Sequence, residues 1–252
     1  MSKKIGTEFM KFTQYKYLDE SDQSKGTPQP PCELPYDQNQ DMIELPKPGT
    51  LNSRKVNLQQ LIEDRQSLRK YSDKPLTLTE LSYLLWNTQG VKKRITKDKP
   101  TGKVDVTFRT VPSAGARHPF ETFLLINNVE GLNKGLYRYI ATEHTLIEVN
   151  MDHHIADQIT DACLSQRFII ESAVTFIWMA DIDRTVWRYG ERSYRYAHLD
   201  AGHVCQNLYL SAEMLDAGVC AIAAYDDDAL NKLLGFNGEN QFVIYIGTVG
   251  KK

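Results

Sequence analysis

The sequence predicts an α+β fold in one large domain, and three observations favour this class. Helical and strand-like segments follow one another without the regular alternation of a βαβ fold. Neither a Gly-x-Gly-x-x-Gly turn nor a Gly-Lys-Ser/Thr loop is present, so a Rossmann dinucleotide site and a P-loop are not supported. A long helical segment before Gly218 is apolar on more than one side, which is typical of a helix buried in a core or between subunits.

The composition excludes several classes of protein. With 252 residues, of which 41% are hydrophobic, the chain can bury a substantial core and is not disordered. Its formal charge of -2 gives no general attraction to nucleic acid or to an anionic membrane. No segment approaches the roughly 20 apolar residues of a membrane helix, and the first residues lack the apolar region of a signal peptide. We therefore expect a cytoplasmic protein with no nucleic-acid or membrane partner.

The cysteines and histidines do not predict a metal site. The four cysteines show no Cys-x-x-Cys spacing, which argues against a disulfide framework and against a zinc knuckle. A His-Glu-x-x-His pattern is absent, and His198 and His203 lie too far apart to share a helix face. We expect reduced, mostly buried cysteines and no structural metal.

Residues 1–57 are predicted to form an extended N-terminal arm. This stretch holds six of the ten prolines among many polar residues, a composition that does not keep regular structure for long. It also carries Phe9, Phe12, Tyr15 and Tyr17. Because free tails are usually poor in aromatic residues, an ordered arm laid over the body or over a partner subunit is favoured over a disordered tail.

A helical pattern begins at Val56 and ends near Arg65. At its end Arg65, Ser67 and Arg69 alternate at i, i+2 and i+4. In an extended segment this spacing points two cations and a hydroxyl to one side, as recognition of a phosphate requires. The alternative is a solvated basic turn, and the motif alone favours that alternative.

The next segment opens with a helix signal. Thr77-Leu-Thr-Glu80 is a capping-box sequence, which predicts a core helix that stops at Gly90. The basic stretch from Lys92 to Lys103 follows. Because Thr, Pro, Gly and Asp residues interrupt it, a solvated loop is favoured over a nucleic-acid patch.

The stretch from Val111 to Glu121 is a poor helix and a poor strand. Two prolines bracket four small residues, and Gly115 can take a positive φ, so a flat ligand could approach the main chain closely. The buried-strand candidate Thr122 to Asn127 follows at once, and a rigid strand would hold such a loop in place for function. The alternative is an ordinary turn without a ligand.

The C-terminal half predicts short strands and one long helix. A hairpin is predicted over 135–140 and 145–149, then a helix capped by Asp152 and a strand over 173–180. The segment from Trp187 to Tyr196 mixes arginines with aromatic residues, which suits a pocket rim or a structural aromatic cluster.

The long helix is predicted from Arg195 to Ala217, where Gly218 ends it. A second small-residue loop is predicted from Gly218 to Ala224. A helix capped by Asp226 and a strand over 242–246 complete the chain.

Three separated pieces together resemble one family. They are Arg65-x-Ser67-x-Arg69, Pro112-Ser-Ala-Gly115, and the long helix that runs into Gly218-Val-Cys-Ala-Ile-Ala-Ala-Tyr. In this order and at these spacings they resemble the FMN-dependent nitroreductase superfamily, and more closely its SagB-type dehydrogenase branch. The likeness covers about residues 44–250.

The resemblance implies an α+β homodimer with a central mixed or antiparallel sheet flanked by helices, in which a long buried helix lies at the interface. It implies residues 1–57 as an arm and 58–252 as an FMN-binding domain. The positions that match the cofactor residues of the family are Arg65, Ser67, Arg69, Pro112, Ser113, Ala114, Gly115, Gln166, Ala223 and Ala224.

Each group of these residues has an implied role. The arginines and the serine at 65–69 would hold the FMN phosphate and ribityl chain. Residues 112–115 would come from the other subunit to line the flavin. The main chain at 223–224 would face the isoalloxazine ring, where an N–H directed at the flavin N5 favours hydride acceptance, and Gln166 would contact the pyrimidine end.

The chain departs from the family pattern in two places. Azoline-oxidising members of the SagB branch carry a Lys-Tyr pair before the long helix, whereas this chain has Arg188-Tyr189. An arginine does not act as a base near neutral pH, which puts azoline oxidation in doubt. Many classical nitroreductases also end in a basic tail that reaches the phosphate. Here Lys251 or Lys252 would substitute for it, or the site would be less charged.

The leading interpretation is an FMN oxidoreductase that passes hydride through flavin N5 to or from a small molecule or a modified peptide. Arg188, Tyr189 and Tyr194 would bind or orient the substrate. The alternatives are a nitro or quinone reductase that uses NADH or NADPH, a BluB-like flavin-processing protein, and a non-catalytic flavin-binding partner protein.

Overall fold

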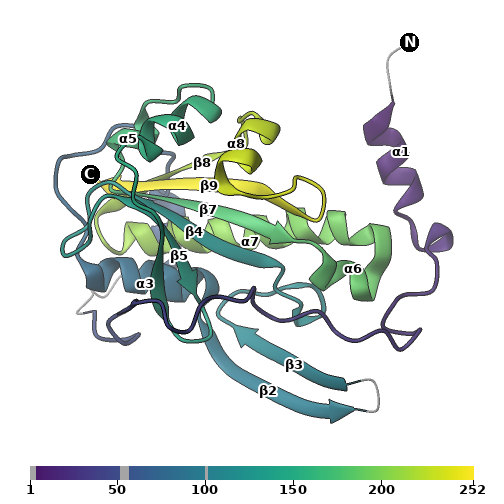
Figure 1. Cartoon of the computed structure of the whole chain (residues 1–252). Coiled ribbons are helices and arrows are strands. Elements are labelled where there is room, and N and C mark those ends of the chain that lie inside the picture. Colours follow the sequence, from purple (N-terminus) through teal and green to yellow (C-terminus); the bar gives the residue numbers. More distant parts are fainter. Residues whose placement is uncertain (1–3, 52–56, 100–101) are drawn as a thin grey trace.

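The computed structural model describes residues 4–51, 57–99 and 102–252, and a seven-stranded sheet forms its centre (Figure 1). The strand order is β1-β6-β5-β4-β7-β9-β8, and all of these neighbours pair antiparallel. The strands are β1 Met42–Glu44, β4 Phe120–Ile126, β5 Gly135–Ile140, β6 Thr145–Asn150, β7 Val174–Asp181, β8 Ala217–Ile222 and β9 Gln241–Lys251. The predicted α+β class is confirmed, and the sheet is antiparallel.

Helices cover both faces of the sheet (Figure 1). On one face lie α3 Leu78–Gln89 and α7 Ser193–Glu213, and on the other lie α4 Ile155–Ala162, α5 Phe168–Glu171 and α8 Asp227–Leu234. Alternate strand residues point to the two faces of the sheet. In β4, Leu124 packs in the core beneath α3 and α7, and Phe123 packs in the core beneath α4, α5 and α8. Continuous burial of β4 and β7 follows from this double cover.

Local sequence signals place two of the helices. Thr77 and Glu80 form the complete capping box at the start of α3, as predicted. The side chain of Asp226 accepts a hydrogen bond from Ala229 N at the start of α8, as predicted. The hairpin β5–β6 and the strands β4 and β7 are also confirmed.

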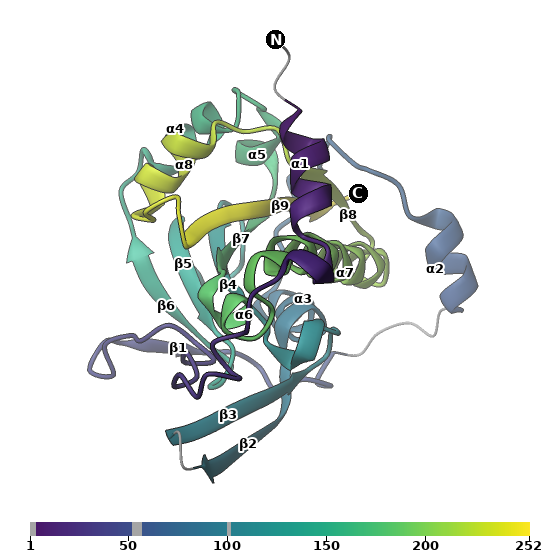
Figure 2. The same cartoon turned by 90° about the vertical axis from the view of Figure 1, so that its right-hand side faces the viewer.

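A projecting hairpin replaces the solvated loop expected between Lys92 and Lys103 (Figure 2). It consists of β2 Val91–Lys99 and β3 Gly102–Arg109, paired antiparallel. The prediction was wrong because Ile95, Val104 and Val106 alternate with polar residues at the strand period, and the lysines between them masked that period.

The long helix and the loop after it also differ from the prediction. α7 ends at Glu213, and residues 217–222 form β8 instead of a loop. A Cβ on Gly218 would lie 2.5 Å from the side chain of Leu68. The absence of a side chain at Gly218 therefore lets the segment 65–69 pack against β8. A further helix, α6 Asp183–Tyr189, was not predicted.

The N-terminal arm has two unlike halves. Its first half contains α1 Ile5–Phe12 and a short 3₁₀ turn at Tyr15–Tyr17, and no residue of α1 is buried. Its second half is part of the body, since Cys32 and Leu45 are buried and β1 pairs with β6. α1 is a regular helix that the proline content did not predict. α2 covers Leu58–Asp64, while its predicted start at Val56 lies outside the described residues.

A buried ionic network fastens the second half of the arm to the sheet. Glu121, 3% exposed, forms ion pairs with Arg184 and with Arg138, the latter at 2.9 Å. Leu34 N donates to the Glu121 carboxylate at 2.8 Å, and Arg138 donates to Leu34 O at 2.6 Å. Burial acts to raise the pKa of Glu121, but the two arginines hold it below its usual value.

Three further findings concern the cysteines, the candidate metal ligands and the helices of the described residues. All four cysteines are free and buried. Within the ranges that the structure covers, no group of His, Cys, Asp or Glu side chains is arranged to hold a metal ion. No helix in those ranges is long and apolar enough to cross a membrane.

Candidate functional site

The proline-bracketed loop at 112–116 is held by α7. Asp200, 5% exposed, accepts a hydrogen bond from Ser113 Oγ at 2.6 Å and from Ala114 N at 3.2 Å. Ser113 Oγ in turn accepts from His118 N at 2.9 Å. Burial raises the pKa of Asp200, whereas the bonds from Ser113 and Ala114 act against that rise. The polar groups of this loop are therefore largely satisfied within one chain.

Gly115 lies directly beneath two of the predicted substrate residues. Its φ is 58°, the left-handed region that glycine adopts most readily. A Cβ at this position would lie 2.5 Å from Tyr189 Oη and 3.2 Å from Arg188 Cδ. The loop and the Arg188-Tyr189 pair therefore lie in contact within one chain. Tyr194 lies apart from this contact, since its ring stacks on Phe242 with centroids 6.2 Å apart.

The segment 65–69 lies along β8. Ser67 forms a parallel bridge with Val219, and Leu68 N donates to Val219 O at 2.9 Å. The hydroxyls of Ser67 and Tyr209 lie 3.0 Å apart, and Tyr209 Oη accepts from Ala221 N at 3.0 Å. Tyr209 of α7 thus ties the basic segment to the strand.

The two arginines of this segment have no carboxylate partner among the described residues. The guanidinium carbon of Arg65 lies 5.3 Å from the ring centroid of Tyr209, a cation–π contact that orients the group without neutralising it. Burial raises the pKa of the nearby Cys220 thiol, and Arg69 acts to lower it. Two guanidinium groups and one hydroxyl are thus gathered beside one strand, which is a donor set suited to a phosphate.

The C-terminal lysines do not add to this positive charge. Lys251 pairs with Glu80 and also donates to Leu215 O, while Lys252 pairs with Glu213. Of the two possibilities raised by the sequence, the one in which a terminal lysine replaces the basic tail is not supported, and the less charged site remains.

Gln166 reaches the end of β8. Its Nε2 donates to Ala224 O at 2.8 Å and to Cys163 O at 2.7 Å. Ala223 and Ala224 are exposed just beyond the strand. The structure therefore brings Gln166 to the 223–224 loop, where it fixes the main chain, and its amide oxygen stays available.

The structure does not bring the two groups of predicted residues together within one chain. Asp200 holds the proline loop and Tyr209 holds the basic segment, and nine positions (209 − 200) separate them. At about 100° per residue, nine positions place them on opposite sides of α7. Between them an exposed stripe runs along the helix, formed by His198, Leu199, Gly202, His203 and Gln206.

The first half of the arm lies beside the proline-loop end of α7. Gln23 N donates to Trp187 O and Trp187 Nε1 donates to Thr27 O, both at 2.8 Å. The phenol oxygens of Tyr15 and Tyr196 lie 2.7 Å apart, and Arg192 Nε donates to Tyr196 Oη at 2.9 Å. The arginine–aromatic segment therefore forms an interface with the arm, which the sequence suggested only in general terms.

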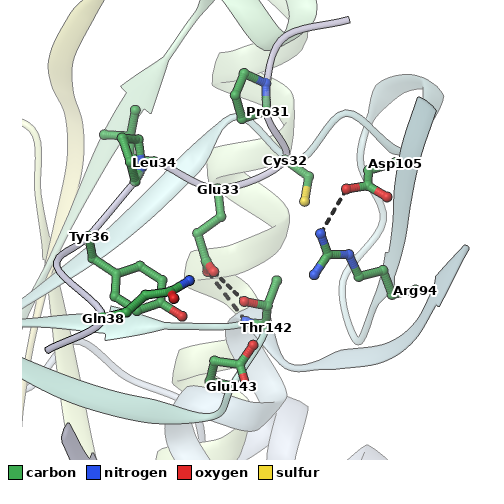
Figure 3. A pocket seen from close by; sticks show the side chains of 11 residues that line it. Pro31, Cys32, Glu33, Leu34, Tyr36, Gln38, Arg94, Asp105, Thr142 and Glu143 are labelled. Carbon is green, nitrogen blue, oxygen red and sulfur yellow. Dashed lines mark hydrogen bonds and ion pairs between the residues drawn. The ribbon is translucent and has the colours of Figure 1, made fainter. Parts of the chain in front are cut away.

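A separate pocket of about 310 Å³ lies between the arm and the β2–β3 hairpin (Figure 3). Glu33 points to its floor and accepts hydrogen bonds from Ala141 N at 2.7 Å and Thr142 N at 3.3 Å. Cys32 points toward the ion pair of Arg94 with Asp105. None of the predicted site residues lines this pocket. The Glu33 carboxylate anchors the arm through its bonds to Ala141 and Thr142.

Sequence reasoning missed Asp200 and Tyr209. Both belong to the long helix, where an aspartate and a tyrosine carry no special pattern. Their partners lie 87 and 142 residues away along the chain, so no local signal identifies them.

Comparison with known proteins supplies the family context. The profile of the Nitroreductase family matches residues 62–251. A protein of Methanocaldococcus jannaschii that carries the provisional name nitroreductase is 32% identical over 212 residues, which cover 84% of this chain and 98% of that protein.

Two further similarities cover smaller shares of the other protein. The trifolitoxin-processing protein TfxB of Rhizobium leguminosarum bv. trifolii is 33% identical over 111 residues, or 42% of this chain and 30% of its own length. A solved structure from Anabaena variabilis, also provisionally named a nitroreductase, is 30% identical with a TM-score of 0.62, and the match covers 77% of this chain and 38% of that chain. This chain thus spans less than half the length of either of these two.

Proposed function

The chain belongs to the nitroreductase family, and from this premise we propose that it is a homodimeric oxidoreductase of the SagB-type dehydrogenase kind. The resemblance drawn from the sequence is confirmed at the level of the family. Its members are FMN-dependent oxidoreductases, so FMN is the cofactor of this chain as well. When bound, FMN supplies a ring that accepts or donates a hydride at N5.

The observation that carries the assignment of the cofactor site is the uncompensated charge beside β8. Arg65 and Arg69 have no carboxylate partner among the described residues, and Ser67 lies between them on the same segment. Neither guanidinium group is neutralised by a carboxylate of those residues, so both can donate to an anion. The phosphate of FMN fits this donor set, and the hydroxyl of Ser67 suits the ribityl chain.

Tyr209 sets the direction of the Ser67 hydroxyl in this proposal. Its oxygen accepts from Ala221 N, so its own proton can go to Ser67 Oγ 3.0 Å away. The proton of Ser67 is then left for an acceptor on the cofactor. Gln166, by holding Ala224 O, keeps the exposed main chain at 223–224 in one conformation for the ring.

The homodimer is proposed because one chain presents its two walls on opposite sides of α7. A second copy laid on the exposed stripe of that helix would set its own proline loop against the basic segment of the first. Leu199, 62% exposed at the centre of the stripe, would be buried there. Each FMN would then have its phosphate held by one subunit and its ring bordered by residues 112–115 of the other.

Two substrate classes remain within this function. TfxB is named for the processing of trifolitoxin, and by analogy with that relative we retain a modified peptide as the first substrate class. This chain has Arg188-Tyr189 where azoline-oxidising members carry a Lys-Tyr pair. Because an arginine binds a substrate but does not take a proton from it, this difference favours a quinone or a nitro compound as substrate. In both cases Arg188 and Tyr189 would orient the substrate above Gly115.

Purification and anaerobic reduction test the proposal. We expect a yellow protein with flavin absorbance, and bleaching on anaerobic mixing with NADPH if the chain is a reductase. A yellow protein that NADPH does not bleach would point to a dehydrogenase whose electrons come from its substrate. A colourless protein that does not take up added FMN would contradict the proposal.

A non-catalytic flavin-binding protein is the rival from another class. It predicts that the protein binds FMN tightly, that neither NADH nor NADPH reduces this FMN, and that the protein turns over no quinone and no oxidisable peptide.

Sedimentation of the yellow protein at the mass of two chains would support the homodimer, and a monomer that holds FMN tightly would contradict it.

A further inference from the structure

Tyr196 lies in a cluster of phenol and guanidinium groups that the proposed site does not yet use. Tyr15 of the arm and Tyr196 of α7 share a hydrogen bond of 2.7 Å, and Arg192 Nε donates to Tyr196 Oη at 2.9 Å. The guanidinium carbon of Arg192 also lies 4.5 Å from the ring centroid of Tyr15 and 5.3 Å from that of Tyr196. The phenol oxygen of Tyr196 therefore accepts from a cation and shares a hydrogen bond with the arm in which either phenol can donate.

This cluster adjoins the proline loop. The rings of Tyr196 and Tyr189 meet edge to face with centroids 5.0 Å apart, and Tyr189 Oη lies over Gly115. Tyr196 also precedes Asp200, which holds Ser113, by one turn of α7. The contacts run without a break from the arm to the loop that borders the flavin in the proposed dimer.

We propose that the phenol of Tyr196, held between Arg192 and the arm residue Tyr15, is the group that exchanges a proton with the substrate. The proposal rests on the proposed function, because it needs a flavin beside the proline loop to exchange the hydride. In the reduction of a quinone, the hydride comes from reduced flavin and the Tyr196 O–H bond breaks to give the proton, so that a hydroquinone and a phenolate result. In the oxidation of a substrate, its C–H bond gives the hydride to the flavin, and the Tyr196 phenolate takes the proton that the substrate loses.

The surroundings of Tyr196 suit this role. Burial acts to raise its pKa, but the hydrogen bonds from Tyr15 and Arg192 and the charges of Arg192 and Arg195 hold the pKa below the usual value. The pKa of Tyr15 is raised, first by its hydrogen bond with Tyr196. The groups that face Tyr196 are Arg192 and Arg195 of the helix start, Tyr189 from the end of α6, and Tyr15 from the arm. The arm therefore contributes directly to the acidity of a group on α7.

The direct test measures the ionisation of single tyrosines and does not depend on turnover. The FMN-loaded full chain would be labelled with ¹³C at tyrosine Cζ and followed by NMR from pH 7 to 11, and the Tyr196→Phe variant would identify its resonance. We expect Tyr196 to titrate below about 10, the ordinary value for a phenol. In Tyr15→Phe, which keeps the ring over Arg192 but loses the hydroxyl, the titration of Tyr196 would move upward. Tyr17→Phe is the matched control on the arm and would leave it unchanged.

The kinetic test uses NADPH as reductant and 1,4-benzoquinone as acceptor. We expect the wild-type kcat to fall as the pH rises through the pKa of Tyr196, because the protonated phenol is the donor. Tyr196→Phe would lower kcat about 100-fold, as loss of a general acid does, and would remove that part of the pH profile while FMN content stays at the wild-type level.

Three results would overturn the inference, and they differ from failure of the proposed function. An ordinary pKa for Tyr196 would exclude the acidified phenol. A lowered pKa together with wild-type turnover and pH profile in Tyr196→Phe would leave the cluster as a fastening for the arm alone. A wild-type protein that binds no FMN, or that binds it but reduces no quinone with NADPH, would overturn the inference together with the reductase form of the proposed function.

Discussion

The two ends of α7 carry surfaces of opposite character. At the Asp200 end the proline loop has its polar groups bonded within the chain, and Tyr189 covers Gly115 closely. At the Tyr209 end Arg65 and Arg69 carry charge that no carboxylate of the described residues neutralises. The first surface has its polar groups satisfied within the chain, and the second keeps two cations that can bind an anion. In the proposed dimer, these surfaces are the two walls of each FMN site, and a single chain presents each wall in a different place.

The largest effect is expected from a substitution in the exposed stripe of α7. Leu199→Glu would place a charge in the proposed subunit interface, and a buried unpaired charge costs about 3 to 5 kcal/mol. We expect sedimentation at the mass of one chain and loss of nearly all FMN. Val149→Glu, at another exposed apolar residue (45%), would stay dimeric and yellow. A monomeric Leu199→Glu variant that keeps its flavin would show that one chain suffices.

Crowding of the proline loop should remove the flavin from that side. A side chain at Gly115 meets Tyr189 and Arg188 in a left-handed backbone, so Gly115→Leu should weaken FMN binding about 100-fold or more, that is by about 3 kcal/mol. Gly131→Leu is the matched control, because Gly131 also has a positive φ but no atom within 4 Å of its Cβ position. Fluorescence titration of the apoprotein with FMN measures both, and unchanged affinity in Gly115→Leu would count against the assignment of the loop.

Removal of the positive charge of Arg65 and Arg69 should weaken only the binding of the FMN phosphate. The double variant Arg65→Gln, Arg69→Gln should bind FMN about 30-fold more weakly, since charge-assisted hydrogen bonds each contribute about 1 to 2 kcal/mol. Riboflavin, which lacks the phosphate, should bind as it does to the wild type. Lys70→Gln, at the exposed neighbouring cation, is the control. An equal loss for riboflavin would place these arginines elsewhere than at the phosphate.

The two damaged walls can be combined to ask which chains share a site. Gly115→Leu and the double arginine variant, co-expressed with different affinity tags, would give mixed dimers. If each site draws one wall from each subunit, one of its two sites has both walls intact, so the mixed dimer should hold about half of the wild-type FMN. If each site lies within one chain, every site carries damage, and the mixed dimer should hold no more flavin than its parents.

The smallest effect is expected at the residue that links α7 to the basic segment. Tyr209→Phe removes the hydroxyl that joins Ser67 to Ala221 N and leaves the ring beneath Arg65. Loss of one such hydrogen bond costs about 1 kcal/mol, so FMN should bind about 5-fold more weakly. Tyr83→Phe, at a tyrosine of α3 that belongs to neither wall, should bind FMN normally. A normal affinity in Tyr209→Phe would remove Tyr209 from the site.

The elements that the sequence predicted correctly are those that carry their own signals. α3 begins with a complete capping box, and β4 is an uninterrupted apolar run. The prediction of a loop in place of β8 was wrong because the small residues of this segment have no strand preference of their own. Its strand conformation depends on β9 on one side and on Ser67 and Leu68 on the other, and these lie far away in the sequence.

The same distinction applies to the candidate site. The basic segment, the proline loop and the 223–224 loop could be put forward as parts of the proposed site because their residue types and spacings form motifs. Asp200 and Tyr209, which hold those motifs, could not, since each acts through one hydrogen-bonding group on a helix of otherwise ordinary sequence. The motifs identify the surfaces that face a ligand, whereas the residues beneath them become visible only when the chain is folded.

The ionic network around Glu121 has a consequence for synthesis of the chain on the ribosome. Leu34 is bonded to Glu121 and Arg138, and Glu121 is paired with Arg184, which leaves the ribosome 150 residues (184 − 34) after Leu34. At bacterial or eukaryotic rates this interval is roughly 10 to 30 s. During that time the arm, with the side chains of Cys32 and Leu45 that are buried in the folded chain, has no place to dock. The arm is made before the sheet and is thus among the last segments to be seated, and nascent chains should need protection at the arm until β7 and α6 have emerged.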